Sequence, residues 1–256
     1  MRKTTDNLEA YDYVLRGLEF LNRARQQTNV QARQLFEKAI ELDPQYAQAY
    51  AWLGRSYLVE WIMQWSQDPQ TLEQAFTLEQ KAITLDDSLP VAHSILSHVY
   101  LWRKQHERAI AEAERAIALD PNDAEGYLYL GVILVQAGRP EEGIGLIEKA
   151  MRLNPRYPPG YLNNLGYAYQ VAGRYEEALA PPKKVLTLNP NFMLSHLNLA
   201  GCYAELGRLE EARAEVAEVL RLNPNLSLEG LKQTVPFKDQ AESERYLAAL
   251  RKAGLK

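Results

Sequence analysis

A short motif, Leu-Asp-Pro or Leu-Asn-Pro, recurs along this chain at a nearly constant interval. Its prolines Pro121, Pro155, Pro190 and Pro224 stand 34, 35 and 34 residues apart, and Pro44 closes an earlier copy. A fixed period of this size is typical of a structural unit that is stacked many times, because one such unit cannot bury its own apolar faces. The period therefore predicts a repeat array.

The copy at residues 127–155 reads as two helices joined by a turn. Gly138 and Pro140 predict the turn, since glycine tolerates the left-handed position after a helix and proline suits the first turn of the next one. Before the turn, apolar residues cover most of the helix circumference, so that helix needs cover on two sides. After the turn, Ile144, Ile147 and Met151 recur at helical spacing. Stacking of neighbouring copies would supply the missing cover.

Matched positions in the copies resemble the tetratricopeptide repeat (TPR) family, whose period is about 34 residues. The family's aromatic-Leu-Gly-aromatic signature appears as Tyr50, Leu53, Gly54 and Tyr57, as Tyr127, Leu130, Gly131 and Leu134, and as Tyr161, Leu165, Gly166 and Tyr169. The resemblance implies an all-α fold, a right-handed α-solenoid of six helix-turn-helix repeats. We expect a single solenoid over residues 1–256, with repeats at about 8–46, 47–89, 90–123, 124–158, 159–192 and 193–226 and a C-terminal cap at 227–256.

Departures from the regular pattern in repeats one, two and five predict local structure. In repeat one, Thr28 and Gln31 form a capping-box signature for the second helix. Repeat two is nine residues longer between its glycine and its stop, and Asp68-Pro69 predicts where its second helix begins. In repeat five, Pro181 and Pro182 fall inside the second helix, where a proline costs about 3 kcal/mol. We therefore expect a kink or a late helix start at that point.

The pattern changes after Pro224. Residues 227–234 predict a short helix that ends before Pro236, and Asp239 then predicts the cap of a last helix, stopped by Gly254. Tyr246, Leu247 and Leu250 form one apolar stripe on that helix. Since repeat arrays need a terminal element with one polar face, we expect this segment to cap the core.

The composition argues against several classes of partner. The formal net charge of -4 offers no general attraction for nucleic acid. No apolar run approaches the roughly 18 residues that span a membrane, and the opening MRKTTDN lacks the apolar core of a secretion signal. The single cysteine, Cys202, is expected to be a buried apolar residue. We expect a cytoplasmic protein with no nucleic-acid partner and no membrane insertion.

A search for catalytic chemistry finds no phosphate-binding GxxxxGK loop, no HExxH and no paired CxxC. The histidines also make a poor metal site: His93 and His98 are five apart on a helix, His106 lies in a turn, and His196 holds a signature aromatic position. The acidic pairs that open several second helices suit the helix dipole. We expect no enzyme activity, no metal and no cofactor.

The family resemblance predicts a binding groove. In TPR proteins the first helices line the concave side, and partner contacts come mainly from their second, fifth, ninth and twelfth positions. Carried onto this chain, these positions give a candidate peptide groove of Arg55, His98, Leu128, Val132, Asn163, Tyr167 and Gln170. An apolar centre of this kind suits an extended or helical peptide with apolar anchors. The alternative is that these residues only pack against one another inside a tight superhelix.

Both ends of the chain carry a second resemblance. The opening NLEAYDYVLRGLEFLNR and the closing NPNLSLEGLKQTVPFKDQAESERYLAALRKAGL look like the borders of the TPR region that follows the catalytic domain in many bacterial class III adenylate or guanylate cyclases. Similar regions follow DNA-binding domains in some bacterial regulators. The resemblance implies a non-catalytic protein-protein interaction scaffold, the regulatory TPR region of a larger bacterial signalling protein. The alternative is an oligomerisation or intramolecular regulatory arm of a nucleotide cyclase or a transcription regulator.

The long hairpin of repeat two carries a separate expectation. Trp61 and Trp65 are four apart, which places them on one face of a continuous helix. Either Leu72 and Phe76 of the same hairpin cover them, or they form an oligomer or domain contact. We predict that at least one of the two rings contacts another chain or stays largely exposed. Partners in this reading are a protein or peptide, an adjoining catalytic domain or a homodimer.

Overall fold

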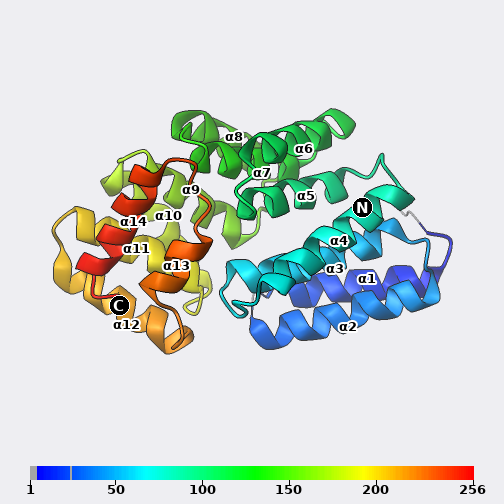
Figure 1. Ribbon diagram of the computed structural model, residues 1–256, viewed down its shortest axis with the longest axis horizontal. Helices are drawn as coiled ribbons and strands as arrows, with labels where there is room; N and C mark the ends of the chain where they lie inside the picture. The colour runs from blue at the N-terminus through cyan, green and yellow to red at the C-terminus, as the bar shows by residue number, and fades with distance from the viewer. Residues whose placement is uncertain (1–4, 24) are drawn as a thin grey trace. The chain divides into compact units, whose positions relative to one another are not determined.

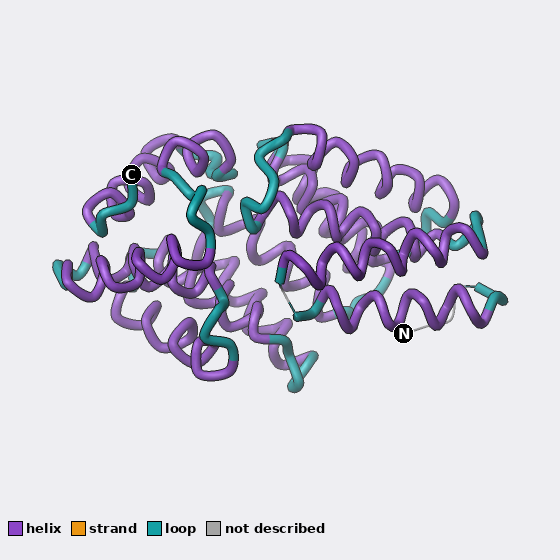
Figure 2. The backbone as a smooth tube through the Cα atoms, turned by 90° about the horizontal axis from the view of Figure 1, so that it is seen from below, coloured by secondary structure: helices purple, strands orange, loops and turns teal. Residues whose placement is uncertain are grey.

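The computed structural model describes residues 5–23 and 25–256, and within these ranges every regular element is a helix (Figure 2). The all-α fold class is therefore confirmed. Residues 1–4, on which part of the expectation about the opening MRKTTDN rests, and residue 24 lie outside the described ranges.

The predicted repeats each contain two consecutive helices, labelled in Figure 1. The helices are α1 (Leu8–Leu21), α2 (Gln26–Leu42), α3 (Ala47–Ile62), α4 (Pro69–Leu85), α5 (Pro90–Trp102), α6 (His106–Leu119), α7 (Ala124–Gln136), α8 (Pro140–Leu153), α9 (Pro159–Val171), α10 (Tyr175–Leu188), α11 (Met193–Glu205), α12 (Leu209–Leu222), α13 (Leu228–Thr234) and α14 (Gln240–Lys252).

The chain divides into two compact units. Unit 1 comprises Met1–Tyr100 and Ala111–Pro121, and unit 2 comprises Leu101–Ile110 and Asn122–Lys256. The single solenoid over residues 1–256 stays a prediction.

In unit 2, the hairpin of α7 and α8 is held by an unusually close backbone approach. A Cβ atom built on Gly131 would lie 2.8 Å from the carbonyl oxygen of Gly143, and one built on Gly143 would lie 2.5 Å from the carbonyl oxygen of Gly131. Neither helix could carry a side chain there. The flexibility that Gly143 adds to α8 is thus offset by a contact that only two facing glycines permit.

The turns after the first helices use a left-handed residue. Gly138 and Gly173 have φ of 83° and 76°, as the glycine rule predicts. In repeats two and three, which lack this glycine, Gln64 and Lys104 adopt φ of 55° and 58° instead. The backbone geometry of the turn is therefore kept where its preferred residue is absent.

The local predictions for repeats one and two have different outcomes. Asp68 caps α4, accepting a hydrogen bond from the amide of Gln70 at 2.9 Å, and α3 and α4 have 16 and 17 residues, so the long hairpin is confirmed. The capping box of Thr28 and Gln31 is wrong. Helix α2 begins at Gln26, and the Thr28 hydroxyl, already inside the helix, donates to the carbonyl of Arg25.

The two prolines of repeat five lie inside a continuous helix, α10. The predicted late start is therefore wrong. Pro182 is buried, and its Cδ would lie 2.6 Å from a Cβ built on Gly166, so the ring packs closely against the bare glycine of α9. This packing offsets part of the cost of the missing N–H groups.

The prediction of two helices after Pro224 is confirmed. Ser227 caps α13 through the amide of Gly230, and Asp239 caps α14 through the amide of Ala241. Helix α14 packs against α11, the first helix of the last repeat, rather than only closing the end of the stack (Figure 1).

The tryptophans of repeat two do not share a helical face, because α3 ends at Ile62 and Gln64 is left-handed. Trp61 is 8% exposed and Trp65 is half-buried. The expectation that one ring stays largely exposed is therefore wrong, because the described chain itself leaves neither ring largely exposed. Contact of Trp61 or Trp65 with another chain stays a prediction.

Candidate functional site

The predicted groove residues of unit 2 lie on α7 and α9. We call the surface formed by α7, α9 and α11 the first-helix face. Leu128 and Asn163 are each 4% exposed and Gln170 is 5% exposed, whereas Val132 and Tyr167 are half-buried. Most of these side chains are therefore already covered by the chain itself.

Asn163 and Gln170 connect α9 to α11. The Asn163 side-chain oxygen accepts hydrogen bonds from the Ser195 hydroxyl at 2.9 Å and from the Asn198 amide at 3.1 Å. Gln170 fills the space beside Gly201, where an added Cβ would overlap its amide nitrogen. Both contacts link successive repeats, and a role of either residue in peptide binding stays a prediction.

Tyr167 is the centre of an aromatic cluster with Phe237 and Tyr246. Its ring centroid lies 6.4 Å from that of Phe237 and 6.2 Å from that of Tyr246, and the last two are 5.7 Å apart. The Tyr167 hydroxyl accepts a hydrogen bond from the Gln136 amide at 2.7 Å. Burial raises the pKa of Tyr167 well above its usual value, so the hydroxyl stays protonated.

The extended segment Val235–Asp239, which we call the linker, joins α13 to α14 and brings Phe237 to this cluster. Nε2 of His106 lies 2.7 Å from the Pro236 carbonyl oxygen and donates to it. The amide of Lys238 donates to the Gln136 carbonyl at 2.9 Å, and its ammonium group lies 2.6 Å from Glu107. The linker is therefore held through both its backbone and its side chains.

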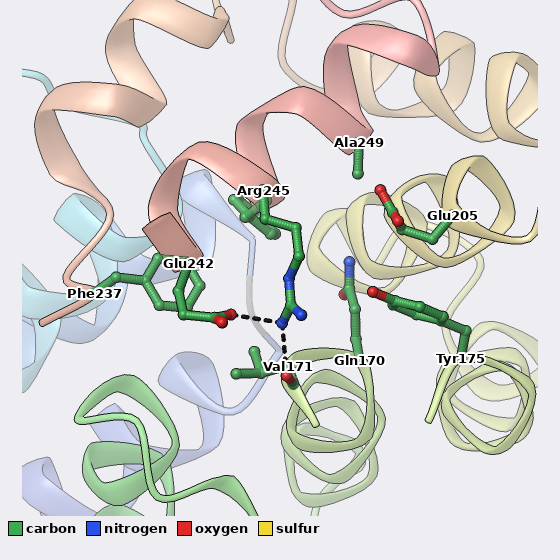
Figure 3. A pocket seen from close by; sticks show the side chains of 9 residues that line it. Gln170, Val171, Tyr175, Glu205, Phe237, Glu242, Arg245 and Ala249 are labelled. Carbon is green, nitrogen blue, oxygen red and sulfur yellow. Dashed lines mark hydrogen bonds and ion pairs between the residues drawn. The ribbon is translucent and has the colours of Figure 1, made fainter. Parts of the chain in front are cut away.

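Helix α14 is attached through Arg245 (Figure 3). The guanidinium donates to the carbonyl of Val171 at 2.8 Å and lies 2.5 Å from Glu242. Beside it, a small pocket opens between α14 and the body of unit 2, lined in part by Gln170, Tyr175 and Glu205. The packing of α14 is thus incomplete on this side.

Sequence reasoning placed Tyr246 in an apolar stripe of the last helix but did not find what that stripe covers. It missed the other residues that cover the first-helix face or hold the linker on it, namely His106, Gln136, Phe237, Lys238 and Arg245. One signal was available. Three apolar residues, Val235 to Phe237, fill a short break between two helices where a polar turn is usual. Such a run indicates a segment that packs against something.

In unit 1, Arg55 and His98 lie in one electrostatic neighbourhood with Glu79. Burial, and then the charge of Arg55, lower the pKa of His98 to about 3, so its ring is neutral. Burial raises the pKa of Glu79, which is 0% exposed, and the charge of Arg55 opposes this shift. The Arg55 guanidinium also lies 5.4 Å from the ring of Trp52.

Glu79 stands at a core position of the repeat. The equivalent residues contact the glycine of the first helix: Phe36 faces Gly17 and Ile147 faces Gly131, as Glu79 faces Gly54. Sequence alignment of the repeats could have found this carboxyl among apolar residues. It is the strongest chemical departure from the pattern in unit 1.

The described residues contain no group of three or more His, Cys, Asp or Glu side chains placed to hold a metal ion. Among the same residues, no helix combines the length and the apolar character that crossing a membrane requires. Cys202 is 0% exposed, and burial raises the pKa of its thiol to about 12, so it is no reactive thiolate.

Stacked helical hairpins with a two-sided first helix define the class of α-solenoid interaction scaffolds. Family models described as tetratricopeptide repeat match residues 35–70, 98–158 and 172–235, together more than half of the chain. The chain belongs to the tetratricopeptide repeat family. Its repeats are those of a scaffold that binds protein or peptide partners, and proteins of this fold are in general non-catalytic.

Solved structures support the fold. The APC/C hetero-tetramer Cut9-Hcn1 matches 94% of this chain with a TM-score of 0.66 at 20% identity, over 43% of its own chain. TTC0263, a TPR protein of Thermus thermophilus, matches 77% of this chain and 99% of its own, with a TM-score of 0.56 at 25% identity. PilW, a type IV pilus biogenesis factor, matches 81% of this chain and 88% of its own, with a TM-score of 0.58 at 20% identity.

One curated relative is similar in sequence. "Putative adenylate cyclase 3" of Rhizobium meliloti (strain 1021) is 36% identical over 102 residues, which are 40% of this chain. The matched part is only 17% of that protein. This chain therefore resembles the repeat region of a protein named as a cyclase, and spans a small share of its length.

Proposed function

We propose that the first-helix face of unit 2 binds a protein or peptide segment, and that the chain is the regulatory TPR region of a larger bacterial signalling protein. The proposal is based on how the linker is held on this face. Its backbone accepts from His106 and donates to the Gln136 carbonyl, and its aromatic side chain enters the cluster around Tyr167. A surface that holds an extended segment in this way has the features of a peptide-binding site.

In this proposal the chain acts in the cytoplasm and performs no catalysis itself. On the first-helix face of unit 2, Leu128, Val132 and Tyr167 would supply apolar contacts, and a role of Arg55 and His98 in peptide binding stays a separate prediction for unit 1. Because a fully buried aliphatic side chain contributes about 1.5–3 kcal/mol, two such anchors give a peptide a measurable affinity.

A displayed peptide library selected against the purified protein tests the proposal. We expect the selected peptides to lose binding to Val132→Asp, which places a charge on the first-helix face, and to keep binding to Leu188→Asp. Leu188 is the matched control because it is 68% exposed on the second helix α10. Selected peptides that bind the Val132→Asp variant with unchanged affinity would contradict a site on this face.

The second candidate is an oligomerisation or intramolecular regulatory arm of a class III nucleotide cyclase or a transcription regulator. The similarity to the Rhizobium meliloti protein over 102 residues favours the cyclase form. The coding sequence upstream of Met1 distinguishes the candidates: an in-frame cyclase domain supports the arm, and an in-frame DNA-binding domain supports the regulator. If an arm of this kind regulates an attached catalytic domain, adding the separate array should change the activity of that domain.

A further inference from the structure

The C-terminal segment meets the first-helix face of unit 2 at three regularly spaced basic residues. Lys238, Arg245 and Lys252 are seven residues apart. Their partners are Gln136, Val171 and Glu205, which are the last residues of α7, α9 and α11. One basic residue of the segment therefore meets the end of each first helix in turn.

All three contacts place a donor at the C-terminal end of a first helix, but the donor is a backbone amide at Lys238 and a charged side chain at Arg245 and Lys252. The amide of Lys238 donates to the carbonyl of Gln136 at 2.9 Å, and the Arg245 guanidinium donates to the carbonyl of Val171 at 2.8 Å. The Lys252 ammonium lies 3.5 Å from the carboxylate of Glu205. The last carbonyls of a helix lack intrahelical partners and carry the negative end of its dipole, so this edge favours donors and cations.

Two of the three basic residues, Arg245 and Lys252, lie on α14, whereas Lys238 precedes that helix. Seven residues of helix advance about 10.5 Å. Neighbouring packed helices lie about 8–10 Å apart. A helix laid across the first helices therefore presents one cation per repeat when its cations recur every seven residues.

The apolar residues Phe237, Leu247 and Leu250 of the segment are buried, and its polar contacts with the rest of unit 2 have two weak points. The ion pair of Lys238 with Glu107 is between side chains that are 52% and 78% exposed. The amide oxygen of Gln170, beneath α14, has no hydrogen-bond partner within the described chain, and a pocket opens beside it. Exposed ion pairs and unmet buried polar groups make a contact easy to break.

We propose that residues 235–252 are a detachable internal ligand of the first-helix face. The external partner is a protein segment of the same chemistry: an aromatic residue followed by a cation, leading into a helix with further cations at seven-residue steps. This partner displaces residues 235–252 when it binds. The inference rests on the proposed function, because it concerns the same binding face and states which segment occupies that face and how a partner gains access to it.

A fluorescent synthetic peptide of residues 234–252, TVPFKDQAESERYLAALRK, is the probe. The double variant Phe237→Ala/Arg245→Glu of the full chain removes the aromatic contact and one cation of its own segment, which frees the face. We expect the peptide to bind this variant at least about 100-fold more tightly than wild type, because an attached segment competes at a high effective concentration. Lys184→Glu, which reverses an exposed cation on α10, should behave as wild type.

A second peptide with the same two changes, Phe237→Ala and Arg245→Glu, tests the specificity of binding. This peptide should not bind the double variant. Equal binding of the first peptide to wild type and to the double variant, or binding to neither, would overturn the proposal. So would a wild-type dimer that the double variant converts to a monomer, because the segment would then belong to a second copy.

Amide hydrogen exchange of the wild-type chain provides a test that needs no variant. We expect the amides of α14 to exchange as a separate unit, faster than those of α9 and α11, and α14 to exchange faster still in excess peptide. Exchange of α14 only together with α11 would show a permanent part of the core and would overturn the inference. Library peptides could lose binding to Val132→Asp and yet bind wild type and the Phe237→Ala/Arg245→Glu variant equally well. That result would contradict this inference but not the proposed function.

Discussion

Nδ1 of His196 lies 2.5 Å from the carboxylate of Glu215, and its Nε2 lies 2.9 Å from the carbonyl oxygen of Pro190. Both partners only accept hydrogen bonds, so the ring satisfies both when it carries two protons. His93 repeats the arrangement with Glu112 and the Asp87 carbonyl. Burial lowers the pKa of each histidine, but the hydrogen bonds and the charge of the glutamate raise it more, and the net shift is upward.

The two histidine–glutamate contacts predict that the stability of the protein depends on pH. A raised folded-state pKa means that the stabilisation is fully present below the unfolded-state pKa of about 6.5 and is lost as the pH rises through the higher folded-state pKa. We expect the double variant His93→Gln/His196→Gln to be about 1–3 kcal/mol less stable than wild type at acidic pH. Urea unfolding at a series of pH values measures this difference. It should shrink steadily toward alkaline pH, and a constant difference would contradict a charged pair.

Substitution of Glu79 is expected to raise the stability, whereas substitution of the two histidines is expected to lower it. Its carboxyl is fully buried, and burial raises its pKa, with the charge of Arg55 opposing. The folded state therefore keeps the proton at a pH where the unfolded state has lost it, and stability falls as the pH rises above the unfolded-state pKa of about 4.3. Glu79→Gln should be about 1–3 kcal/mol more stable than wild type at pH 8, with a smaller gain near pH 5. Glu37→Gln, on the exposed side of α2, is the control in the same unfolding measurement. A destabilised Glu79→Gln would show that the ionised carboxylate is needed.

Pro181 and Pro182 predict unequal effects in α10. Replacing Pro181 by alanine restores one amide donor and removes a ring clash, so this variant should gain about 1–3 kcal/mol of unfolding free energy. Pro182→Ala should gain less, because its ring packs against Gly166 and that contact is lost. Thermal unfolding followed by circular dichroism compares the two variants. An equal gain for both would mean that the contact with Gly166 contributes nothing.

The left-handed turns predict a reciprocal pair of substitutions. Lys104 has φ of 58°, a conformation that costs a residue with a Cβ about 1–2 kcal/mol. Lys104→Gly should therefore stabilise the protein by about 1 kcal/mol, and Gly173→Ala, at φ of 76°, should destabilise it by a similar amount. Urea midpoints of the two variants check the signs. Two shifts in the same direction would be inconsistent with a steric origin.

Much of the fold could be read from the sequence because the determining chemistry is local. The recurring Leu-Asp-Pro and Leu-Asn-Pro stops, the left-handed Gly138 and Gly173, and the caps Asp68 and Asp239 act within a few residues of the helix ends that they define. Thr28 shows the limit of such rules, since its capping signature competes with the helix start at Gln26. Short-range signals therefore determine that helices form, but they predict the exact ends of those helices less reliably.

The covering of the first-helix face was decided only by tertiary structure. His106 meets the carbonyl of Pro236 across 130 residues, and no local pattern encodes which distant carbonyl a histidine will reach. Likewise, the cost of Pro182 depends on a glycine of another helix, and the position of Phe237 depends on Tyr167 and Tyr246. The sequence by itself determined the repeating helical hairpin, because period and turn chemistry are written along the chain. Which segment lies on the first-helix face followed from packing and long-range hydrogen bonds, because these exist only once the repeats have stacked.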